Sequence, residues 1–142
     1  MTRVVLFIAA VLLLAACGGG GGNSEADQVK QVWTSFFSAK TPISQKPAML
    51  QDGARFESAI MSLGKNPLAS ELSAKVSSVT LEGPNKAKVA YTIYLGKVAA
   101  LRNLIGYAYK QRGKWLVGYA GLCELIALQP GVTLPAGCSS HA

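Results

Sequence analysis

Three cysteines are the residues of this 142-residue chain best suited to chemistry, and their neighbours point to two different reactions. Cys17 directly follows residues 14–16 (LAA) and the apolar run of residues 4–14. Small residues before a cysteine are typical of a lipobox, in which the thiol receives diacylglycerol before a peptidase cuts the chain. The alternative is an ordinary secretory peptide with a chance cysteine. The lipobox interpretation predicts an export signal over residues 1–16 and lipidation of Cys17.

The predicted signal indicates where the rest of the chain would be held. The apolar run of residues 4–14 is too short to cross a bilayer as a permanent helix, and no second run of membrane length follows. Two acyl chains hold a protein stably at a membrane, whereas one binds reversibly. The Gly-rich residues 17–24 would form a flexible tether. We therefore expect a lipid-anchored protein at the extracytoplasmic face of the cell membrane, with its domain at residues 25–142.

Cys123 and Cys138 remain as a pair once Cys17 is assigned to lipid. An oxidising compartment favours a disulfide between them, and closing a loop of this length contributes about 3 kcal/mol in the chain-entropy model. The alternative is two free buried thiols. The chain has no CxxC motif, which argues against a disulfide-exchange enzyme. We expect a bridge that pins the C-terminal tail to the domain.

Charge and composition narrow the range of partners. The formal charge of +7 becomes +6 when Arg3 leaves with the signal, and the basic residues are scattered rather than clustered. This pattern favours a solvated basic surface, or attraction to anionic head groups and envelope polymers, and it disfavours nucleic acid. His141 lies in the tail, and no His or Cys pair has zinc spacing. We expect no catalytic residue, no metal and no cofactor.

The elements that would position any site begin with a helix. Ser24 is suited to cap its start, and apolar residues then recur at helical spacing through Trp33 and Phe37, as far as about residue 40. Residues 44–63 predict two shorter helices, separated by an Asp-Gly turn.

The second half of the chain has the alternating pattern of β-strands. Strands are predicted at residues 76–81, 88–95, 104–110 and 115–119, with a loop at 96–103 and a short helix at 122–128. Helices followed by an antiparallel meander indicate an α+β domain. A long helix laid across a curved four-stranded sheet would bury its aromatic face.

If the domain is hollow, its pocket should lie between the first helix and the concave face of the sheet. The candidate lining residues are Trp33, Phe37, Tyr91, Tyr107 and Trp115. For each of them core packing is the favoured interpretation and ligand contact the alternative.

Five segments carry a resemblance to a known family. They are residues 33–37 (WTSFF), 45–53 (QKPAMLQDG), 76–81 (VSSVTL), 89–96 (VAYTIYLG) and 113–118 (GKWLVG), the last leading to Leu122 and Cys123. In order and spacing they resemble, over about residues 25–128, the mycobacterial low-molecular-weight secreted antigen family. The resemblance implies an NTF2-like (cystatin-like) α+β cone and an exported, often immunogenic protein, and it supplies no catalytic residue. A typical secreted member lacks the lipid anchor predicted here.

The leading hypothesis is a non-enzymatic envelope lipoprotein that binds an apolar ligand or an envelope partner. Two alternatives stay open. NTF2-like folds also host isomerases and dehydratases, which would need a carboxylate beside a hydrogen-bond donor. The residues available for that role are Asp52, Glu57, Tyr91, Tyr107 and Tyr109, with fold analogy as the only support. A purely structural module would instead have a filled cone and an exposed apolar patch.

Overall fold

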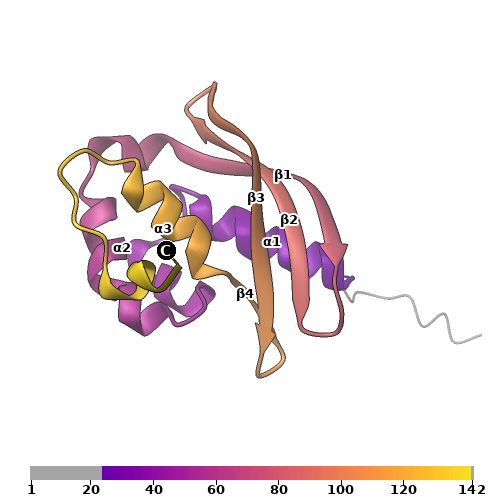
Figure 1. Cartoon of the computed structure of the whole chain (residues 1–142). Helices are drawn as coiled ribbons and strands as arrows, with labels where there is room; N and C mark the ends of the chain where they lie inside the picture. The colour runs from indigo at the N-terminus through magenta and orange to yellow at the C-terminus, as the bar shows by residue number, and fades with distance from the viewer. Residues whose placement is uncertain (1–23, 142) are drawn as a thin grey trace, which may run out of the picture.

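A curled sheet with helices on its inner face forms the domain (Figure 1). The computed structural model describes residues 24–141; the predicted signal (1–16), the predicted lipidation site Cys17 and residues 18–23 of the predicted tether lie outside the described residues. In chain order the elements are α1 (Glu25–Phe37), η1 (Ile43–Met49), η2 (Gly53–Phe56), α2 (Glu57–Gly64), η3 (Pro67–Glu71), β1 (Leu72–Leu81), β2 (Lys86–Leu95), β3 (Val98–Gln111), β4 (Lys114–Val117), α3 (Tyr119–Ala127) and η4 (Ala136–His141). Among these helices none is long and apolar enough to cross a membrane.

The four strands are antiparallel and lie in the order β1-β2-β3-β4, so each pairs with its neighbours in sequence. The register shifts between Val76 and Ser78 in β1, and on both sides of Ile93 in β2. Such irregularities bend strands and increase their twist, and the sheet curls into a half-barrel (Figure 1). Helices packed on this curled sheet confirm the predicted α+β, cone-like fold.

Helix α1 begins and packs as the sequence predicts. The Ser24 hydroxyl accepts a hydrogen bond from the Asp27 backbone N–H at 3.1 Å, which satisfies a donor that the first helical turn leaves free. The helix ends at Phe37, slightly before the predicted end, because the next residue is extended and the Ala39 N–H donates to the Leu72 carbonyl of β1. The residues of its buried face are Val29, Trp33, Phe36 and Phe37.

The core is centred on a close contact between α1 and the middle of the sheet. The Trp33 and Tyr91 ring centres lie 4.9 Å apart, and the Phe37 ring stacks on Tyr91 at 5.7 Å. Gly106 of β3 lies directly beneath Trp33, because a Cβ at this position would be 2.5 Å from the indole ring. Only glycine therefore fits here without displacing Trp33.

Three sequence predictions are wrong in detail. Residues 98–103, expected to form a loop, belong to β3 and pair with the end of β2. Their period-2 pattern is obscured by register shifts and by Asn103, whose φ is 56°. Tyr119, expected in the last strand, begins α3 because β4 ends at Val117. Of the two helices predicted over residues 44–63, the second is present as α2, preceded by the short 3₁₀ segment η2, whereas the first is the 3₁₀ segment η1.

The C-terminal tail is fixed to the domain by the predicted disulfide, which joins Cys123 of α3 to Cys138. Gly137 packs against the Phe56 ring, where a Cβ would approach to 2.7 Å. Phe56 also stacks on Tyr119, with ring centres 5.3 Å apart. These contacts hold α3 and the tail beside η2 and α2, at one end of the cone (Figure 1).

Candidate functional site

An apolar cavity of about 470 Å³ lies at the end of the cone where α1 finishes. Its walls come from the last turn of α1, from η1, α2 and η3, from the strand ends around the β2–β3 turn, and from α3. The lining side chains are mostly aliphatic and include Phe37, Ile60, Leu63, Leu101, Leu122 and Leu125. Ligand sites in proteins span about 300–1,000 Å³ and are mostly apolar. The cavity therefore has the size and the chemistry of a ligand site.

Local chain geometry explains why this end is less filled than the centre. Beyond Phe37 the chain continues in short 3₁₀ segments and an eight-residue helix. Runs of 3₁₀ helix are short, so each of these segments contributes only a few side chains to the core. At the rim, Leu68 and Leu128 are 53 % and 61 % exposed. These exposed leucines extend the apolar surface of the cavity to its mouth.

One cation lies in this apolar wall. Lys46 of η1 is only 9 % exposed, and it is the one ionisable residue among the described residues that line the cavity. Burial lowers the pKa of its ammonium below the ordinary value of 10.5. Within residues 24–141 the ammonium has neither an ion-pair partner nor a hydrogen-bond acceptor. Sequence reasoning missed Lys46 because a lysine beside a proline carries no periodic signal of burial.

The five residues that the sequence offered as a possible pocket lining lie in different parts of the structure. Of the five candidate residues only Phe37 lines the cavity. Trp33 and Tyr91, which are 0 % and 1 % exposed, fill the space between α1 and the concave face of the sheet. Tyr107 alternates with buried neighbours and lies on the outer face, 4.5 Å from the Lys86 ammonium. For Trp33 and Tyr91 the structure therefore shows the core packing that the sequence favoured over ligand contact, because the aromatic face of α1 packs directly on the sheet.

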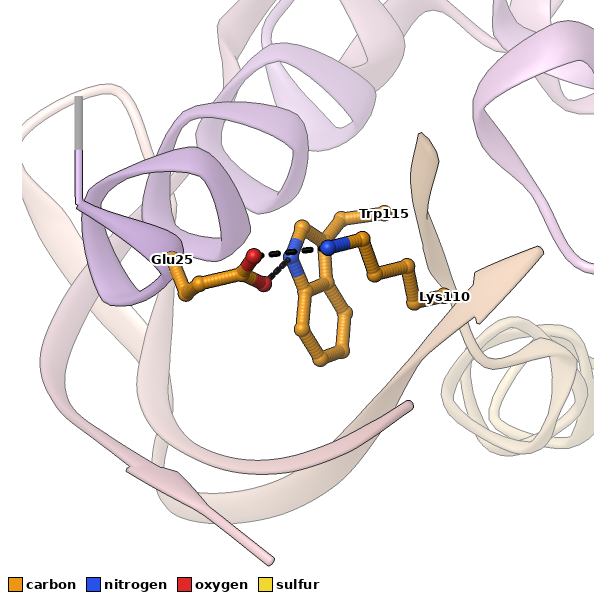
Figure 2. A network of polar contacts seen from close by, with 3 residues as sticks. All are labelled: Glu25, Lys110 and Trp115. Atoms are coloured by element: carbon orange, nitrogen blue, oxygen red, sulfur yellow. Dashed lines mark hydrogen bonds and ion pairs between the residues drawn. The ribbon is translucent and has the colours of Figure 1, made fainter. Parts of the chain in front are cut away.

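Trp115, the fifth candidate, belongs to a polar network at the opposite end of α1 (Figure 2). The Glu25 carboxylate accepts a hydrogen bond from Lys110 Nζ and another from Trp115 Nε1, each at 2.6 Å. The bond from Lys110, followed by the bond from Trp115, lowers the pKa of Glu25 below its ordinary value of 4.5. This Glu25 network ties the first residue of α1 to β3 and β4.

A groove of about 690 Å³ lies beside the Glu25 network, between α1, η1 and β4. Trp115 and Val32 contribute apolar surface to it, and glutamine and serine side chains contribute polar surface. The groove is more open to solvent than the cavity. Since ligand sites bury most of a small ligand against apolar surface, the cavity is the stronger candidate.

The residues considered for catalysis are spread over the molecule. Asp52 is exposed in the turn before η2, with a φ of 54°, and Glu57 is exposed at the start of α2. Tyr91 lies in the core, where burial raises its pKa to about 12. Tyr109 shares the outer face of β3 with Tyr107, and none of these five residues lines the cavity. Among the described residues no three His, Cys, Asp or Glu side chains are grouped to hold a metal ion.

These features define a disulfide-bonded α+β domain with a packed centre and an apolar cavity at one end. Residues 23–132 match the family model described as "Low molecular weight antigen MTB12, C-terminal domain". Because this match covers well over half of the chain, the chain belongs to that family, and the resemblance seen in the sequence is confirmed. Comparison with curated proteins and with solved structures found no match.

Proposed function

We propose that this protein is a cell-envelope lipoprotein whose domain binds the apolar part of a ligand and catalyses no reaction. The observation that carries the proposal is the cavity of about 470 Å³ with its largely aliphatic wall. Burying apolar surface contributes roughly 25 cal/mol per Å², so a hydrocarbon chain in this cavity would gain affinity without an array of polar contacts. The family match supports an antigen-type protein, and the cavity supports a binding role for its domain.

The proposed location is the extracytoplasmic face of the cell membrane. Residues 4–17 combine an apolar run, small residues and Cys17 in the order of a lipobox. The tether would join the domain at the first residue of α1, whereas the cavity lies at the last turn of that helix. At 1.5 Å per residue these two points are about 20 Å apart. This separation would leave the cavity mouth accessible while the protein is anchored.

Native mass spectrometry of the full chain, extracted from host membranes in mild detergent, tests both parts of the proposal. The chain should carry the mass of a lipid on Cys17, and Cys17→Ala should lose it. The extracted protein should also retain a non-covalent hydrocarbon ligand. Ala69→Phe, on the cavity wall, should remove that ligand, because the larger ring occupies the cavity. Ala120→Phe, exposed on α3 and outside the cavity, is the matched control and should keep it.

The two parts of the proposal can fail separately. Folded wild-type protein that repeatedly carries no hydrocarbon ligand would exclude the binding role. Membrane-bound wild-type protein with an unmodified thiol at Cys17 would exclude the lipid anchor.

A further inference from the structure

Lys46 is the one ionisable residue among the described residues that line the apolar cavity. It comes from η1, in which every other residue is exposed or half-buried. The one side chain that this segment buries is therefore its lysine. Lysine is almost never buried in proteins unless it is paired, so its position calls for a physical explanation.

No group described in the protein supplies that pairing. The ion pairs of residues 24–141 join Lys86 to Glu82 and Lys110 to Glu25, both away from the cavity. Burial lowers the pKa of Lys46, and within the described part of the chain no carboxylate opposes this effect. Reducing the hydration of an ammonium is unfavourable unless an opposite charge compensates for the lost contacts with water. A negatively charged group on the ligand would provide this compensation.

We propose that the cavity takes a long-chain carboxylic acid, with its hydrocarbon chain among the apolar side chains and its carboxylate paired with Lys46. The inference rests on the binding function proposed above and adds the charge of the ligand's head group. The apolar wall matches the hydrocarbon chain of such a ligand, and the ammonium, which has no partner among residues 24–141, matches its carboxylate. Hydrogen bonds between an ammonium and a carboxylate are shorter and stronger than neutral ones, so the pair would contribute affinity as well as orientation.

The competing interpretation is a lysine that buries its hydrocarbon stem and extends its ammonium to the surrounding water. The remaining 9 % exposure of Lys46 is compatible with this interpretation. The two interpretations differ in one measurable property, which is whether the cavity prefers an acid over an uncharged ligand of the same chain length.

Isothermal titration calorimetry of the full chain, freed of non-covalently bound lipid, with dodecanoate and with dodecanol measures this preference at neutral pH. The two ligands share a chain length and differ in charge. Wild-type protein should bind dodecanoate at least about tenfold more tightly, as expected for a hydrogen bond to a charged group. Lys46→Met should lose the preference and still bind dodecanol, whereas Lys46→Arg should keep the preference. Lys88→Met changes the net charge equally at an exposed position of β2 and should behave as wild type.

Each outcome decides between the proposals. Equal affinity of the wild type for both ligands, or a preference that persists in Lys46→Met, would overturn the acidic head group and leave the binding function intact. Failure of both ligands to bind would overturn the binding function and this inference with it. Thermal unfolding should show that each variant is folded. If Lys46→Met does not fold, Lys46→Gln gives the same comparison with a polar side chain.

Discussion

The middle of the cone and its end beyond α1 are built in opposite ways. In the packed centre, defined by Trp33, Tyr91 and Gly106, aromatic rings lie directly on the sheet and fill the space beneath α1. At the cavity end, which includes Lys46 and Leu125, short segments enclose about 470 Å³. Close packing stabilises a fold, whereas an unfilled apolar space sacrifices contacts. The comparison indicates that stability comes mainly from the centre and that this allows the cavity end to remain hollow.

Trp33→Ala should have the largest effect on stability. It should lower the free energy of unfolding by about 3–5 kcal/mol, because it leaves a void between α1 and the sheet. Leu125 is a half-buried residue on the cavity wall, and part of its surface already faces empty space. Leu125→Ala should therefore lower the free energy of unfolding by less than about 2 kcal/mol. Urea unfolding of both variants measures the difference. Equal losses would contradict the division between a packed centre and a hollow end.

Removing the disulfide should have the next largest effect and should act on the cavity end. Cys123→Ser combined with Cys138→Ser should cost about 3 kcal/mol in the chain-entropy model. Because Cys123 lies on α3, which forms part of the cavity wall, dodecanol affinity should fall as well. In contrast, the tryptophan fluorescence, which comes from Trp33 and Trp115, should stay close to that of the native protein in the folded variant if the centre packs independently. If the double variant is less stable than the wild type but binds dodecanol with the same affinity, the disulfide does not shape the cavity.

Sequence patterns predicted the packed centre well. The helical spacing of Trp33 and Phe37 and the alternation through Tyr91 identified residues that are buried in the structure. The pairing of Cys123 with Cys138 followed from counting cysteines once Cys17 was set aside. The hydrophobic pattern repeats regularly along the chain, and the number of cysteines leaves one pair for a disulfide. Both signals can therefore be recognised without knowledge of the tertiary contacts.

The cavity end could not be predicted in the same way. The burial of Lys46 depends on how η1 meets α2 and the sheet, and a single lysine gives no repeating sequence pattern that would indicate burial. The first part of β3 was missed because register irregularities and the positive φ of Asn103 interrupt its alternation. Gly106 was not singled out, because glycine is required there by the close approach of the Trp33 ring and not by a turn. All three depend on contacts between residues far apart in the sequence.

Glu25→Gln should have the smallest effect, and that effect should depend on pH. The bonds from Lys110 and Trp115 lower the pKa of Glu25 in the folded state. A carboxyl group with a lowered folded-state pKa contributes stability above its unfolded-state pKa, and this contribution is lost as the pH falls through the folded-state pKa. The wild type should therefore be slightly more stable than the variant at neutral pH, and the two should converge well below pH 4.5. The Glu25 side chain is 41 % exposed, so solvent screening keeps the difference small.

Thermal unfolding at pH 7 and at pH 3 measures this convergence, with Glu57→Gln as the matched control. Glu57 is also exposed, and within residues 24–141 no cation is bonded to it, so its variant should track the wild type at both pH values. An equal difference for Glu25→Gln at both pH values would mean that the network acts through the packing of Trp115 and not through charge. Because Glu25 and the cavity lie at opposite ends of α1, Glu25→Gln should also leave dodecanoate affinity unchanged. A change in that affinity would mean that the two ends of the helix are coupled through the packed centre between them.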